Sequence, residues 1–167
     1  TTRQTQNFDR PFDMATVCQA MDETGSFTPV PLVVCDPATH RLFGFITNTE
    51  RGDVAVVDIS RRINVDVDPA LPGFSRRAVG SMPAVVVPHP SSEWVFTVNR
   101  GSSDLTRVET LPPRATSGGY ASATPGARAG LFAAVTQPLP HRPFDMVIGP
   151  DLRLYDGEWP LVAAPTT

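Results

Sequence analysis

The feature that most constrains this chain is an internal repeat with an offset of 51 residues. Several polar, proline and apolar positions recur at this offset: Pro37 and Pro88, Asn48 and Asn99, Asp53 and Asp104, Phe43 and Trp94, Phe45 and Phe96, Val54 and Leu105. Repeated units bury their apolar faces against their neighbours. The repeat therefore predicts a protein built from copies of one element.

A second repetition supports the same conclusion. The pentapeptide RPFDM occurs at residues 10–14 and again at residues 142–146, each time followed by a small apolar run. Its arginine and aspartate, Arg10 with Asp13 and Arg142 with Asp145, could form a repeated contact for an anion or a partner. Because the pair recurs as part of the repeat, we favour the alternative of a structural pair that bridges neighbouring units.

The repeated unit has the pattern of strands joined by turns. Short runs rich in β-forming residues alternate with turn residues at about ten-residue spacing, which is typical of an all-β protein. The chain also has 18 prolines and 12 glycines, and proline is excluded from helix interiors. The predicted strands are residues 32–35, 42–47 and 54–59 in one copy, and 83–87, 94–98 and 105–108 in the other.

Two segments interrupt this pattern. Residues 111–130 are rich in Pro, Gly, Ser and Ala, which predicts a long surface loop within one domain that spans residues 1–167. Residues 69–77 connect the two copies and could hold an extra loop. The only helix-like stretch is residues 12–23, and the repeat explains it better.

The repeated segments resemble YVTN-type β-propeller repeats. The resemblance lies in residues 33–43 with Thr47 and Asn48, residues 52–58, and residues 79–83 with 98–102, so residues 31–109 match best. It implies an all-β fold of four-stranded antiparallel blades, and related propellers include surface proteins and lactonases. Propellers have 4 to 8 blades, so this chain would be an incomplete β-propeller. We expect a partner chain, or the remainder of a longer polypeptide, to complete it.

Cys18 and Cys35 are the only cysteines. A disulfide between neighbouring strands would be worth about 3 kcal/mol for a loop of this size and would indicate an oxidising, extracytoplasmic compartment. The alternative is a pair of buried thiols, since free cysteine is among the most buried residue types.

No catalytic or metal-binding motif is evident. His40, His89 and His141 lack HExxH or CxxC spacing and are interpreted as exposed turn residues, so no metal or cofactor is expected. There is no G-x-S-x-G elbow, and Ser81 and Ser102 are assigned to hairpin turns. This lack of motifs favours a protein without catalytic activity over an enzyme.

The best candidates for a contact surface are polar residues in repeat-equivalent turns, which would face one rim of a propeller. Loops on such a rim commonly carry binding residues. The candidates are Asn48, Arg51, Asp53, Asn99, Arg100 and Asp104. The aromatic residues at equivalent strand positions are expected to form the core between units: Phe12, Phe43, Phe45, Trp94, Phe96 and Phe144.

Charge and hydropathy argue against nucleic acid and a membrane as partners, and two hypotheses about function remain. The formal net charge is −3, which offers no footprint for nucleic acid, and no apolar run is long enough for a membrane span. The favoured hypothesis is a non-catalytic scaffold or protein-binding propeller module in a surface or envelope assembly. The alternative is part of a lactonase-like propeller enzyme whose metal site is completed by other blades.

Overall fold

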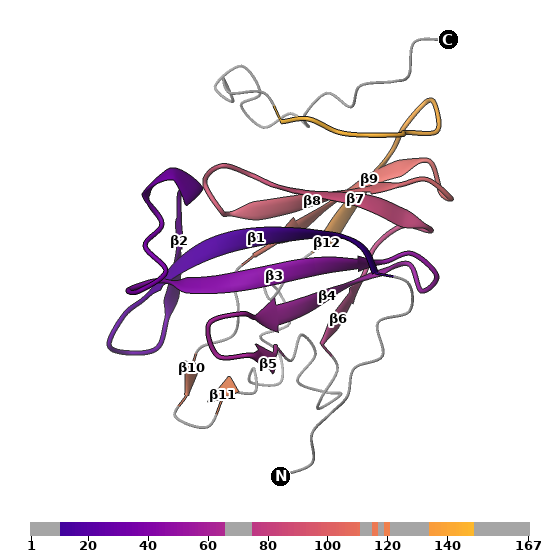
Figure 1. Cartoon of the computed structure of the whole chain (residues 1–167). Helices are drawn as coiled ribbons and strands as arrows, with labels where there is room; N and C mark the ends of the chain where they lie inside the picture. Colours follow the sequence, from indigo (N-terminus) through magenta and orange to yellow (C-terminus); the bar gives the residue numbers. More distant parts are fainter. Residues whose placement is uncertain (1–10, 66–74, 111–114, 117–118, 121–133, 149–167) are drawn as a thin grey trace.

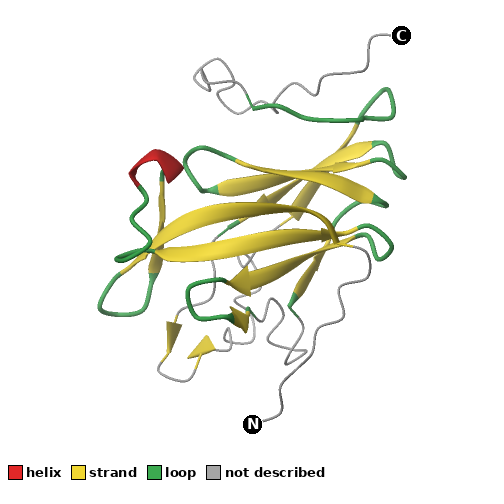
Figure 2. Ribbon diagram, viewed as in Figure 1, coloured by secondary structure: helices red, strands yellow, loops and turns green. Residues whose placement is uncertain are grey.

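The computed structural model describes residues 11–65, 75–110, 115–116, 119–120 and 134–148. Almost every regular element in these residues is a β-strand, and the strands pair antiparallel (Figure 2). The prediction of an all-β protein is therefore confirmed. Two main sheets lie face to face, and residues 139–148 form a third layer over the second sheet (Figure 1).

The first sheet has the strand order β2-β1-β3-β4-β5, and β6 pairs with the other end of β4. The strands are β1 (Pro11–Met21), β2 (Phe27–Val30), β3 (Arg41–Asn48), β4 (Asp53–Asp58), β5 (Ile63–Asn64) and β6 (Arg76–Ala78). The β3–β4 hairpin lies where the sequence predicts two adjacent strands.

The second sheet has the strand order β7-β8-β9-β12. Its strands are β7 (Pro83–Pro88), β8 (Trp94–Asn99), β9 (Asp104–Glu109) and β12 (Ala134–Pro138). The predicted strands of the second copy are thus confirmed. Two short strands, β10 (Ala115–Thr116) and β11 (Gly119–Tyr120), form a hairpin within the predicted 111–130 loop, the rest of which lies outside the described residues.

The prediction of a strand at residues 32–35 is wrong. Leu32–Val34 is a single 3-10 turn, η1, and the Val33 side chain is 91% exposed. Pro31 and Pro37 flank this short apolar run, and its first amide, Leu32 N–H, donates to Pro90 O instead of to a strand. The place beside β3 is taken by β1, which carries the first RPFDM segment from Pro11 onward.

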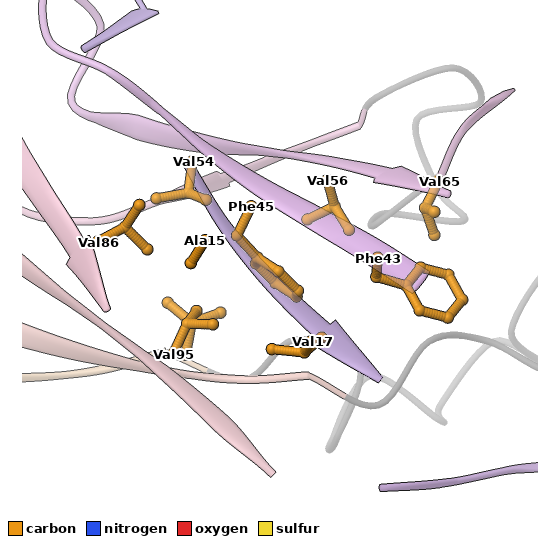
Figure 3. Packing of buried hydrophobic residues seen from close by; sticks show 10 residues of the cluster. Ala15, Val17, Phe43, Phe45, Val54, Val56, Val65, Val86 and Val95 are labelled. Atoms are coloured by element: carbon orange, nitrogen blue, oxygen red, sulfur yellow. The ribbon is translucent and has the colours of Figure 1, made fainter. Parts of the chain in front are cut away.

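The main core lies between the two sheets (Figure 3). The first sheet contributes one face of β1, β3 and β4, and the second sheet contributes the face of β7, β8 and β9 that we call its near face. The buried residues of this core are Ala15, Val17, Phe43, Phe45, Val54, Val56, Val65, Val86, Val95 and Val108. We call the opposite side of the first sheet, which carries Met14 and Ile46, its outer face.

A second, smaller core lies on the far face of the second sheet. Phe96, Val98 and Leu105 pack there against Met146 of the third layer. The aromatic prediction is therefore confirmed for Phe43, Phe45 and Phe96. It is wrong for Phe12 and Phe144, which are 63% and 62% exposed.

Candidate functional site

The turns that join β3 to β4 and β8 to β9 have the same internal design. In the first turn Asn48 Nδ2 donates to Asp53 Oδ1 at 2.6 Å, and in the second turn Asn99 Nδ2 donates to Asp104 Oδ1 at 2.5 Å. Asn48 and Asn99 are fully buried. These four candidate residues thus close their own hairpins, and their role in binding stays a prediction.

Each turn also holds one residue in the left-handed region. Gly52 has a φ of +68°, as its position in the sequence predicts, and Ser103 at the equivalent position of the second turn has a φ of +54°. Only glycine adopts this conformation without a steric cost. The two turns therefore share one backbone shape despite different residues.

The segment before β7 packs tightly on the second turn. Ser81 N–H donates to Ser102 Oγ at 2.8 Å, and Gly101 N–H donates to Ser81 O at 2.9 Å. A side chain at Gly80 is excluded, since a Cβ there would lie 2.3 Å from Asp104 Oδ1. Ser81 and Ser102 thus take part in turn geometry, as the sequence predicts.

An open groove of about 620 Å³ lies between the first turn and this segment. It is lined by Thr49, Glu50, Arg51 and Gly52 on one side and by residues 78–82 on the other. Of the six predicted contact residues, only Arg51 lies in the groove. Both Arg51 and Glu50 already interact with other groups of the chain. The charged side chains that line the groove are therefore not available as unpaired groups for a ligand.

Arg100 joins the two copies of the repeated pentapeptide, which the sequence alone did not indicate. Its guanidinium lies 4.3 Å from the ring centre of Phe144 and 5.9 Å from that of Phe12. Its Nη2 also donates to Phe144 O at 3.0 Å. The two exposed phenylalanines therefore flank one cation at the rim, which explains why neither is in the core.

The aspartates of the pentapeptide form backbone contacts. Asp13 Oδ1 accepts from Met14 N–H at 2.9 Å, and Asp145 Oδ1 accepts from Met146 N–H at 2.8 Å. The second oxygen of Asp13 accepts from Val86 N–H at 3.0 Å and so connects the first sheet to β7. Asp13 thus joins two units through a backbone amide, and the expected structural pair with Arg10 stays a prediction. Arg10 lies outside the described residues.

Cys18 and Cys35 lie at disulfide distance, with sulfur atoms 1.99 Å apart and Cα atoms 6.1 Å apart. Cys35 follows η1 and is not on a strand, so the expected link between neighbouring strands is wrong in that detail. His40 offers a ring nitrogen within 4.8 Å of both sulfur atoms. Since the sulfurs are bonded to each other and His40 Nδ1 accepts from Asp36 N–H, this cluster presents no set of free metal ligands.

His89 is half-buried, in contrast to the exposed turn residue that the sequence predicts. Its ring contacts Trp94 edge to face, with centroids 5.1 Å apart, and Nδ1 accepts from Ser91 N–H at 3.2 Å. Burial lowers the pKa of His89 below its ordinary value, and the nearby Glu93 carboxylate opposes this shift. The ring is thus placed as a neutral packing element.

The sequence matches no protein-family model and no curated protein. In the part of the chain that the structure describes, no helix is long and apolar enough to cross a bilayer.

Thr49 and Arg100, which are 51 residues apart, each donate to a backbone carbonyl of the next layer, at acceptors that differ by one repeat position. Thr49 Oγ1 donates to Pro83 O at 3.0 Å, and Arg100 donates to Phe144 O. A second pair of bonds recurs with the left-handed residues as acceptors: Val79 N–H donates to Gly52 O, and Leu139 N–H donates to Ser103 O, both at 2.9 Å. Val79 and Leu139 each stand four residues before the proline that opens the next layer.

Proposed function

We propose that this chain is a non-catalytic scaffold or protein-binding module built from stacked β-units of the propeller type, and that it acts outside the cytoplasm within a larger assembly. The observation that carries this proposal is the pair of matching junctions. A backbone bond at the same repeat position holds each unit to the next, so the units form a directional stack, whose end faces need partners.

The exposed apolar residues agree with such a role. Met14 and Ile59 of the first unit, and Val147 of the third layer, are all more than a third exposed. Apolar residues that gather at the ends of a repeat stack are typical of surfaces that receive another unit. The YVTN-type repeat is the family whose architecture would supply such units.

The disulfide supports the proposed compartment. Disulfides persist in oxidising environments such as the periplasm and the cell exterior. The lactonase-like alternative has no comparable support, because the described residues offer no cluster of free metal ligands other than the one that the disulfide occupies.

The test is native mass spectrometry of the protein isolated from its source cells without reductant, beside denaturing mass spectrometry and metal analysis. We expect a native mass above the 18.0 kDa of one chain, no stoichiometric divalent ion, and cysteines that resist alkylation before reduction. A single 18.0 kDa species would contradict the assembly, and one bound divalent ion per chain would favour the enzyme.

A further inference from the structure

Three segments of the chain occupy one structural position. In the first sheet Pro11 pairs with Asn48 and Met14 pairs with Ile46. In the second sheet the residues at the same repeat positions of β8 are paired in the same way: Pro83 with Asn99, and Val86 with Thr97. The register irregularity just after each proline is also shared. Residues 83–86 are therefore the counterpart of residues 11–14.

Residues 143–146 are the third such segment. They repeat residues 11–14 without change, and they follow Leu139, whose amide bond to Ser103 repeats that of Val79 to Gly52. We infer that residues 139–148 open a third unit, which docks on the second sheet as the second sheet docks on the first.

Burial follows this assignment position by position. One position of the segment faces the preceding unit. It is occupied by Met14, Val86 and Met146 in the three units, and these side chains are 55%, 4% and 3% exposed. Among the residues that the structure describes, no other unit packs against the Met14 position, whereas a preceding unit covers Val86 and Met146. The next position along the strand faces the following unit: Ala15 and Val87 are buried or half-buried, whereas Val147 is 71% exposed.

The two ends of the stack are consequently complementary. The side of a unit that carries Ala15 or Val87 covers the side of the next unit that carries Val86 or Met146. The exposed Val147 side of the third unit corresponds to the Ala15 or Val87 side of the other units. The exposed Met14 side of the first unit corresponds to the Val86 or Met146 side. We propose that the outer face of the first sheet binds the Val147 side of a second copy of this chain, head to tail.

Such a contact is heterologous, because it joins two different surfaces. It extends the stack by the same step that already occurs twice within the chain, and it closes into a ring or continues as a filament. This inference rests on the proposed function and assigns both the docking face and its occupant.

The test is native mass spectrometry of the purified chain and three variants, each with its fold verified by circular dichroism. Wild type should give multiples of 18.0 kDa, whereas Met14→Asp and Val147→Asp should each give monomers. Met21→Asp is the matched control, because Met21 is 41% exposed on the same strand but outside the proposed contact, and it should associate like wild type.

A mixture of the two monomeric variants decides the geometry. Met14→Asp retains an intact Val147 side, and Val147→Asp retains an intact outer face, so an equimolar mixture should form a heterodimer with one native contact. A monomeric wild type, an association that Val147→Asp leaves unchanged, or a mixture that stays monomeric would each overturn the head-to-tail contact. If the protein from its source cells forms a complex with a different chain only, the proposed function survives and this inference does not.

Discussion

Met14 and Met146 occupy the same position in two copies of one pentapeptide, yet Met14 is 55% exposed and Met146 is 3% exposed. The difference arises from the neighbours. Met146 packs against Phe96, Val98 and Leu105 on the far face of the second sheet, whereas Met14 lies on the outer face of the first sheet and belongs to neither buried cluster of the described residues. Identical local sequence therefore has a different energetic role in each copy.

Truncation of these two methionines should separate the two roles. Met146→Ala should lower the free energy of unfolding by about 2–4 kcal/mol, since it removes a buried side chain and leaves a cavity. Met14→Ala should lower it by less than about 1 kcal/mol, as surface substitutions usually do. Urea unfolding at a protein concentration too low for association is the measurement. Equal losses in the two variants would contradict the assignment of residues 139–148 to a packed third layer.

The two left-handed turn positions form a matched pair for a second prediction. Ser103→Gly should raise the free energy of unfolding by up to about 1 kcal/mol, because glycine adopts a φ near +54° without the steric cost that serine has. Gly52→Ser should lower it by about 1–2 kcal/mol, since a Cβ would also lie 3.2 Å from Gly80 O. Thermal unfolding of both variants is the measurement, and shifts of the same sign would show that the two turns are not equivalent.

Sequence reasoning located most strands but aligned one of them wrongly. The 51-residue offset predicts β3, β4, β8 and β9, because β3 and β8 end 51 residues apart and β4 and β9 have the same length and begin 51 residues apart. The offset fails for the first strand, since residues 22–40 separate β1 from β3 whereas only residues 89–93 separate β7 from β8. The run at residues 32–34 was apolar enough to resemble the missing strand.

The signal that could have corrected this alignment was the pentapeptide. RPFDM and its apolar continuation mark the start of a strand, and Pro83 stands at the corresponding point of the second unit. The contacts of Arg100 at the rim could not be predicted from the sequence. The meeting of Phe12, Arg100 and Phe144 depends on how two sheets and a third layer stack, which no local pattern specifies.

Reduction of the disulfide should destabilise the protein without abolishing the two sheets. The bond between Cys18 and Cys35 closes a loop that contains β2 and η1, at a separation of 17 residues. A loop of about 15 residues corresponds to about 3 kcal/mol in the chain-entropy description.

Urea unfolding with and without a thiol reductant is the measurement. A variant with both Cys18→Ala and Cys35→Ala should unfold at the lower urea concentration in both conditions. Reductant-independent stability of the wild type would show that the two thiols are not bonded in solution, as the alternative from the sequence holds.

The last prediction concerns pH. Burial against Trp94 lowers the pKa of His89 below its ordinary value of 6.5, so the folded protein binds a proton less readily than the unfolded chain does. Nδ1 of the neutral ring accepts from Ser91 N–H and also lies 2.6 Å from Ser91 Oγ, and protonation of Nδ1 ends its role as an acceptor in both contacts. The contribution of His89 to stability should therefore be fully present above pH 6.5 and should fall as the pH decreases below that value, because protons bound at this ring then favour the unfolded state.

His89→Asn isolates this effect. Asparagine can accept the same Ser91 amide two residues along the chain but does not titrate. The variant should show a smaller loss of stability between pH 7.5 and pH 5 than the wild type, whereas His141→Asn, at an exposed position, should follow the wild type. The measurement is the urea midpoint at each pH. If His89→Asn lost as much stability as the wild type over this range, the acid sensitivity would originate in other groups and not in the buried imidazole.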